Sequence, residues 1–190
     1  MFNQFSENDI LEVGCDEAGR GSYIGAVFAA AVILPPKLKI DKLNDSKKLN
    51  AGLREQLAKI IKENAIAWAV SSVNEQEIDS INILQASIKA MHLAIDKLPI
   101  SPQFIVVDGN KFKPYKNIPF KTIIKGDSLY ANIAAASILA KTTRDQYVLE
   151  LHHQYPDYCW DKNKGYGTEK HRSIIKKIGV SPYHRKSFNI

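Results

Sequence analysis

The alternation of strand-like and helix-like segments along the chain most constrains its fold. Residues 10–15 are apolar and β-compatible, a Gly-rich turn follows, and a second apolar run over residues 23–34 ends at Pro35 and Pro36. Two apolar runs joined by such a turn predict a hairpin of two strands. Strand-like and helical segments then alternate, which indicates an α/β fold with a mixed sheet and helices on its faces.

Periodicity separates the remaining elements. Helices are expected over residues 50–64, 75–80, 83–98, 128–151 and 168–178. Strands are expected over residues 65–73, 103–108 and 119–127. Asp45 or Ser46 could cap the first of these helices, and Pro99 ends the third.

The length and charge of the chain narrow the class of protein. With 190 residues, of which 45% are hydrophobic, the chain can bury one sizeable core, so we interpret residues 1–190 as a single domain. Lys and Arg number 26 against 20 Asp and Glu, which gives a net charge of +6. This balance suits a polyanionic partner such as nucleic acid, although many soluble proteins are mildly basic as well.

Cysteine usage and hydropathy give further exclusions. Cys15 and Cys159 are the only cysteines, and their separation supports neither a disulfide framework nor a zinc site. The N-terminus has no basic stretch leading into an apolar one, so no signal peptide is expected. The longest apolar run, over residues 23–34, is too short to span a bilayer. We therefore expect a cytoplasmic protein with no membrane partner.

Four acids lie at the ends of strand-like runs. Asp16 and Glu17 end the first run, Asp108 ends the run over 103–108, and Asp127 stands where the long helix is expected to begin. Ligands of open α/β sheets bind in the crevice at strand ends, so these carboxylates are expected to converge there. Four carboxylates packed together repel one another unless a cation neutralises them.

The expected cations are Mg²⁺ or Mn²⁺, because oxygen-rich ligation without thiols favours hard divalent ions. Two such ions, roughly 3.5–4 Å apart, could clamp an in-line attack on a phosphodiester. This chemistry is that of a nuclease or a polymerase.

Each acid also has a simpler interpretation. Asp127 before Ser128 could be only a helix N-cap, and Asp108 before Gly109 could be an ordinary turn. Asp16 and Glu17 are adjacent, and adjacent residues of a regular strand point to opposite faces. For both to face one site, the strand must end, twist or bulge there.

A series of motifs carries a family resemblance. In chain order they are GCDEAGRGS, NDSKKL, VVDGN, KGDS, AAASILAKTTRD, KGYGT and HRKSF. From about Val13 to Phe188 the chain resembles ribonuclease HII, the type 2 ribonuclease H family. The resemblance implies an RNase H-like fold, a mixed five-stranded sheet flanked by helices, in which the C-terminal segment of about residues 155–190 completes the substrate groove.

The resemblance also implies an activity. It is that of an endonuclease that cuts the RNA strand of RNA·DNA hybrids and cuts 5′ of ribonucleotides embedded in duplex DNA, as in ribonucleotide excision repair. Hydrolysis by two divalent ions, Mn²⁺ or Mg²⁺, would leave 5′-phosphate and 3′-hydroxyl ends. The expected partners are the hybrid and the ribonucleotide-containing duplex, with a sliding clamp as a further possibility, and the protein is expected to be a monomer.

The family's functional residues match positions of this chain. Its catalytic and metal-binding acids fall on Asp16, Glu17, Asp108 and Asp127. Its GRG motif falls on Gly19, Arg20 and Gly21, where backbone groups recognise the ribose 2′-hydroxyl and the Arg side chain helps to hold a phosphate.

Two further positions match substrate contacts of the family. Tyr166 matches a tyrosine that packs on the sugar after the ribonucleotide, and Lys47 matches a basic residue that could hold a backbone phosphate. Without the family, Tyr166 would be interpreted as a half-buried core residue. Asn82 and Gln85 resemble polar positions near the groove. The chain departs from the commonest pattern at Ser22 and Ala26, where many relatives have proline, and at Asn163, where histidine is frequent.

Three competing functions remain at this point. Ribonuclease HIII shares the sheet and the acids but usually has GTG in place of Gly19–Gly21 and carries an added N-terminal domain. A Holliday-junction resolvase could use a similar acid cluster on DNA, but it would not need a group that reads the 2′-hydroxyl. A non-catalytic hybrid-binding module would fit the positive charge, yet acids in its groove would weaken phosphate binding.

Overall fold

A computed structural model describes residue 5, residues 10–36, residues 38, 40, 41, 43 and 46, and residues 49–189. Its centre is a five-stranded sheet of order β3-β2-β1-β4-β5. The strands are β1 (Glu12–Ala18), β2 (Val27–Ile33), β3 (Ala67–Val73), β4 (Phe104–Asp108) and β5 (Phe120–Ile123). The pairs β1–β2 and β2–β3 are antiparallel, whereas β1–β4 and β4–β5 are parallel. The predicted hairpin and the predicted mixed sheet are both confirmed.

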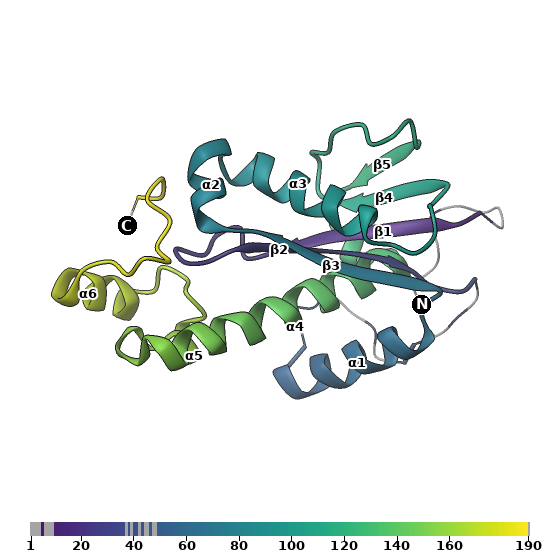
Figure 1. Cartoon of the computed structure of the whole chain (residues 1–190). Helices are drawn as coiled ribbons and strands as arrows, with labels where there is room; N and C mark the ends of the chain where they lie inside the picture. The colour runs from purple at the N-terminus through teal and green to yellow at the C-terminus, as the bar shows by residue number, and fades with distance from the viewer. Residues whose placement is uncertain are drawn as a thin grey trace.

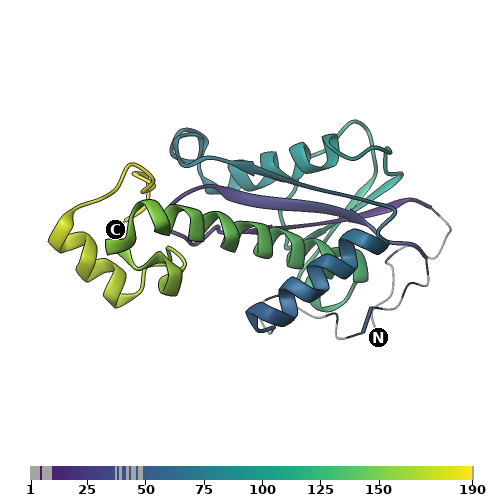
Figure 2. The same ribbon diagram turned by 60° about the horizontal axis from the view of Figure 1, so that its bottom comes forward.

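Helices cover the two faces of this sheet (Figures 1 and 2). α2 (Glu75–Ile81) and α3 (Ile83–Asp96) lie on one side, and α1 (Ala51–Asn64) and α4 (Ala131–Gln154) lie on the other. β2 is buried along its whole length because both of its faces pack against helices. Its residues Val27, Ala29, Ala31 and Ile33 join the core under α3, while Ala30 and Val32 join the core under α4. This two-sided burial explains why β2 is continuously apolar.

The C-terminal segment forms a third, aromatic core at one end of the sheet (Figure 1). It contains α5 (Trp160–Asn163), α6 (Glu169–Ile178) and the short 3₁₀ helix η3 (Pro156–Tyr158). Trp160 is fully buried and its indole N–H donates to His171 Nε2 over 3.1 Å. The expected helix over residues 168–178 is present as α6, with Thr168 as its N-cap.

The sequence predictions need correction at the end of β5, at the start of α4 and at the cap of α1. β5 ends at Ile123, and a 3₁₀ helix, η2 (Gly126–Ser128), separates it from α4, which begins at Ala131 instead of Ser128. Asp127 therefore is not the N-cap of α4, whose cap position is Tyr130. The cap of α1 is Asn50, whose side chain accepts from the Leu53 N–H, so Ser46 does not have that role. Asp45 lies outside the described residues.

None of the helices within the described residues is both long enough and apolar enough to cross a bilayer.

Candidate active site

Asp16 and Glu17 lie on an uninterrupted strand, so of the expected alternatives of an end, a twist or a bulge, neither the end nor the bulge is present. β1 continues to Ala18, and the two side chains point to opposite faces. Asp16 is buried on the α4 side, where it hydrogen bonds Ser137, and Glu17 lines a cavity against α3. The two acids still adjoin a common space, because the β1–β4 ladder stops at the pair Cys15 and Val107, one residue before Asp16.

Asp108 and Asp127 complete the acidic group. Asp108 directly follows Val107 at the end of β4, so it lies beside Asp16 in the extended register. One of its carboxylate oxygens accepts a hydrogen bond from the Asp127 backbone N–H over 3.4 Å. Asp127 is itself buried in η2. The tertiary structure thus brings these four sequence-predicted acids to one edge of the sheet.

The proximity of the acids has an electrostatic consequence. Burial raises the pKa of Asp16 well above its usual range, and the negative charges of Glu17 and Asp108 raise it further, whereas hydrogen bonds from Ser137 and the Glu17 N–H act in the opposite direction. Glu17 is ion-paired with Arg20 over 3.1 Å. Among the described residues, no three His, Cys, Asp or Glu side chains form a closed metal-ligand set as they stand.

A small cavity of about 50 Å³ lies at this acidic edge. Glu17, Arg20, Asp108 and Lys111 contribute charged groups to its wall, and α3 supplies an apolar floor that includes Leu84. The cavity therefore places two carboxylates and two cationic side chains around one opening, which is a suitable environment for a phosphate group held close to acids.

The predicted GRG turn directly follows β1. Gly19 has φ +96°, a backbone conformation that favours glycine. The Ser22 N–H donates to the Gly19 carbonyl, which closes the turn. Gly21 faces the Tyr166 ring, since a Cβ at Gly21 would lie 3.9 Å from Tyr166 Cε1. Ser22 and Tyr166 also form an antiparallel β-bridge. Gly21 and Tyr166 are 145 positions apart in the sequence. The turn and the tyrosine are nevertheless neighbours in the fold.

Tyr166 is partly exposed, with 36% of its surface accessible. Lys141 Nζ and Arg144 Cζ lie 5.7 and 5.0 Å from its ring centroid. The ring is therefore partly open to solvent beside the turn and contacts two cationic side chains of α4.

Sequence reasoning gave no role to two buried arginines behind the turn. Arg144 on α4 and Arg185 in the C-terminal segment are both fully buried. Arg185 donates to the carbonyls of Arg20 and Gly25, each over 2.9 Å, and so fastens both arms of the turn. The motifs that contain them, TTRD and HRKSF, could have marked both arginines as candidates. A motif, however, does not indicate whether an arginine is buried or which group it contacts.

Several other expected positions have structural roles. Asn82 is the N-cap of α3 and accepts from the Leu84 and Gln85 N–H groups. Asn163 shapes the KGYGT turn, because its side chain accepts from the Gly165 N–H over 2.7 Å and donates to the Tyr158 carbonyl over 2.8 Å. Lys47 lies outside the described residues.

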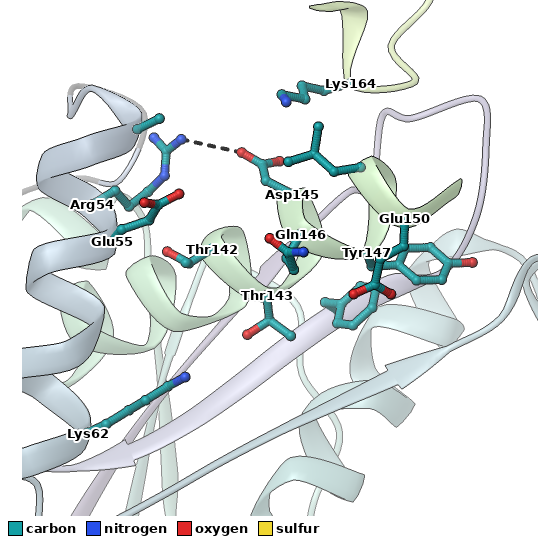
Figure 3. Close-up of a pocket in the computed structure, with 13 residues that line it drawn as sticks. Arg54, Glu55, Lys62, Thr142, Thr143, Asp145, Gln146, Tyr147, Glu150 and Lys164 are labelled. Carbon is teal, nitrogen blue, oxygen red and sulfur yellow. Dashed lines mark hydrogen bonds and ion pairs between the residues drawn. The ribbon is translucent and has the colours of Figure 1, made fainter. Parts of the chain in front are cut away.

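A separate and larger cavity of about 550 Å³ lies between α1 and α4 (Figure 3). Arg54, Glu55 and Lys62 point into it from α1, and α4 contributes Asp145 and Tyr147 among others. Arg54 and Asp145 form an ion pair over 3.3 Å. The lining includes none of the four acids, so the volume of this cavity does not identify it as the reaction site.

Solved structures with the same fold define the class of the protein. Ribonuclease H2 from Pyrococcus horikoshii superposes with a TM-score of 0.79 at 27% identity, covering 94% of this chain and 93% of that one. A PCNA:RNase HII complex from Archaeoglobus fulgidus gives a TM-score of 0.80 at 25% identity, with 95% and 96% covered. Bst-RNase HIII in complex with Mn²⁺ shares the fold, with a TM-score of 0.70 at 19% identity and 90% and 64% covered. The fold is that of a type 2 ribonuclease H, a hydrolase of phosphodiester bonds.

Sequence comparison then distinguishes between the members of this class. The ribonuclease HII family model matches residues 13–190. A ribonuclease HII from Phocaeicola vulgatus is 54% identical over 190 residues, which is 100% of this chain and 94% of that protein. The chain belongs to the ribonuclease HII family, whose activity is cleavage of the RNA strand in RNA·DNA hybrids.

Proposed function

We propose that this ribonuclease H also cuts duplex DNA on the 5′ side of a single embedded ribonucleotide, leaving 5′-phosphate and 3′-hydroxyl ends. The observation that carries the proposal is the position of the GRG turn and Tyr166, which adjoin each other next to the acidic edge. Such an arrangement can read one sugar and its neighbour together. On this basis the protein would act in ribonucleotide excision repair.

Asp16, Glu17, Asp108 and Asp127 are the proposed catalytic and metal-binding residues. Their donor set fits Mn²⁺ or Mg²⁺, since it consists of carboxylate oxygens, and the pKa of Asp16 is raised by burial and by the neighbouring charges of Glu17 and Asp108, which a cation would offset. When bound, two such cations would supply the charge that activates an attacking water and stabilises the leaving oxygen. The carboxylates would orient the scissile phosphate region, and Arg20 and Lys111 would attract its negative charge.

Recognition of the ribose is assigned to the turn. Glycines at positions 19 and 21 allow the main chain to approach a sugar closely, and the 2′-hydroxyl distinguishes RNA from DNA there. Arg20 would hold a phosphate, and its exposed side chain is free to do so on leaving Glu17. Tyr166 would pack on the following deoxyribose. Lys47 remains a proposed phosphate contact on the basis of its motif alone.

The wider context is also proposed. Residues 1–190 would act as one catalytic domain, with the segment of about residues 155–190 completing the groove through the contacts of Tyr166 and Arg185 with the turn. A monomer in the cytoplasm is proposed, with both cysteines free. A sliding clamp is a candidate partner, because the related Archaeoglobus fulgidus enzyme was solved with PCNA.

The experiment that tests the proposed function uses a DNA duplex with one ribonucleotide. We expect a single cut 5′ of the ribonucleotide with Mg²⁺ or Mn²⁺, and no cut after removal of divalent ions with a chelator. An all-DNA duplex and an all-DNA four-way junction serve as controls and should remain intact. Cleavage of the junction would favour a resolvase, and binding to the hybrid without any cut would favour a non-catalytic module.

The raised pKa of Asp16 predicts a pH-dependent effect of cations on stability. A carboxyl whose folded pKa lies above its unfolded pKa makes the folded state hold more protons, so stability falls as the pH rises between those two pKa values. A cation that offsets the repulsion should therefore stabilise more at pH 8 than at pH 5. At 100 times the dissociation constant of Mn²⁺, we expect a rise in Tm of roughly 5–10 °C at pH 8.

Two variants, Asp16→Asn and a control at an exposed position, test whether Asp16 causes this effect of Mn²⁺ on Tm. Asp16→Asn should raise the Tm of the metal-free protein at pH 8 and remove most of the increase caused by Mn²⁺. Asp157→Asn, at an exposed position, should behave like the wild type. An equal Mn²⁺ effect in wild type and Asp16→Asn would contradict the assignment of Asp16.

A further inference from the structure

Arg144 contacts both halves of the proposed sugar-reading site. One of its terminal nitrogens, Nη2, donates to Ser22 Oγ over 2.8 Å on the turn and to the Lys164 carbonyl over 2.5 Å on the segment that carries Tyr166. Its guanidinium carbon lies 5.0 Å from the centroid of the Tyr166 ring. The turn, the tyrosine and helix α4 are therefore connected through one side chain.

The burial of Arg144 costs desolvation free energy. The side chain is fully buried, and its Nη1 forms an ion pair with Asp145 Oδ1 over 3.3 Å. Its Nε atom makes no hydrogen bond to any described residue. Buried ionic groups are expensive to desolvate, and well-packed apolar residues in their place are often no less stable. The planar guanidinium, however, can donate in two directions and stack on a ring at once, which lysine cannot do.

Ser22 supplies the turn's side of this connection. Its side chain is fully buried, and its hydroxyl contacts the Ile24 and Gly165 carbonyls as well as Arg144. Ser22 therefore provides a polar contact between the turn and Arg144.

We propose that Arg144 is a positioning residue that sets specificity: through Ser22 and the Tyr166 segment, it fixes the spacing between the turn that reads the ribose and the ring that packs on the next sugar. This inference rests on the proposed function of that site. We expect this spacing to matter more for cleavage at an RNA-to-DNA junction than for cleavage of a long RNA·DNA hybrid. At an RNA-to-DNA junction both halves must engage neighbouring sugars at once, whereas a long hybrid offers many registers and does not present a deoxyribose after each ribonucleotide.

Arg185 supplies a matched comparison. It is also fully buried and holds the turn at Arg20 and Gly25, but it is stacked against Phe188, 5.1 Å from that ring centroid. No hydrogen bond joins it to the KGYGT turn among the described residues. Arg185→Lys should therefore weaken turn geometry for every ribose-containing substrate alike, while Arg144→Lys should weaken the junction selectively.

The test measures kcat/KM on two substrates, a DNA duplex with one ribonucleotide and a long RNA·DNA hybrid. For Arg144→Lys we expect the single-ribonucleotide value to fall about tenfold more than the hybrid value, because the guanidinium's contacts with Ser22, the Lys164 carbonyl and the Tyr166 ring are all altered. For Ser22→Ala we expect it to fall about threefold more, because only the contact with the turn is lost. Arg185→Lys should lower both values by similar factors. In a Tyr166→Ala background, Arg144→Lys should leave the ratio of the two values unchanged, because the group it positions is absent.

Failure of the Arg144 role and failure of the proposed function give different results in this test. A thermal melt checks that each variant folds, and Ser22→Ala, which removes one buried oxygen, carries the test if Arg144→Lys does not fold. Equal losses on the two substrates for both variants, or an effect fully additive with Tyr166→Ala, would overturn the role of Arg144. If the wild type cuts the hybrid but not the single-ribonucleotide duplex, it is the proposed function that fails.

Discussion

Asp108→Asn should lower kcat for hybrid cleavage by about 1,000-fold or more while the protein still binds the hybrid. Asparagine keeps an oxygen that can accept from the Asp127 N–H, so the fold should be preserved. It removes the negative charge that lies beside Asp16 and contributes to the raised pKa there. Cleavage should be followed with both Mg²⁺ and Mn²⁺, and binding by fluorescence anisotropy without divalent ions.

Binding of the hybrid by Asp108→Asn provides a second measurement, and it should not show the loss that cleavage shows. Removal of a negative charge from a phosphate-binding groove should leave the dissociation constant of the hybrid unchanged or lower it. Asp157→Asn again provides the control, since it removes an exposed carboxylate far from the acids in the sequence and should leave both kcat and binding at wild-type values. Full activity of Asp108→Asn with Mn²⁺ would rule out the assignment of this edge as the metal and catalytic site.

Gly14→Ala should destabilise the fold by about 3 kcal/mol, the upper end of the usual cost of overpacking. A Cβ at Gly14 would lie 2.5 Å from the Asn132 carbonyl oxygen, and backbone at the start of α4 cannot move aside like a flexible side chain. Asn132 is fully buried, accepts from the Leu34 N–H and donates to the Glu12 carbonyl, so it fastens α4 to both β1 and β2.

This contact also places the candidate site. Gly14 lies two residues before Asp16, and Asn132 lies five residues after Asp127, so the close approach of α4 to β1 sets the distance between these acids. We therefore expect Gly14→Ala to lower Tm by roughly 6–12 °C and to reduce cleavage at temperatures where it is still folded. Gly52→Ala on the exposed side of α1, where only Asn50 Oδ1 is near a new Cβ, should not lower Tm. Equal stability of Gly14→Ala and wild type would contradict this packing argument.

The sequence by itself determined the order and type of the main elements and the identity of the four acids. Apolar periodicity is a local property, and it located the hairpin, α3 and α6 within a few residues. The motifs led directly to Asp16, Glu17, Asp108 and Asp127, and to the turn and Tyr166. Short-range patterns could not separate η2 from α4, because 3₁₀ turns are frequent at the ends of α-helices and continue into them along the sequence.

Only the tertiary structure decided how these residues act on one another. Asp16 and Glu17 remain on a regular strand with opposite orientations, and they share one edge because β4 pairing ends before them. The burial of Arg144 and its contact with Ser22, 122 positions away, have no local signal. A polar side chain in a core must find its partners among residues that the fold brings close, and those partners depend on packing across the sheet and not on neighbours along the chain.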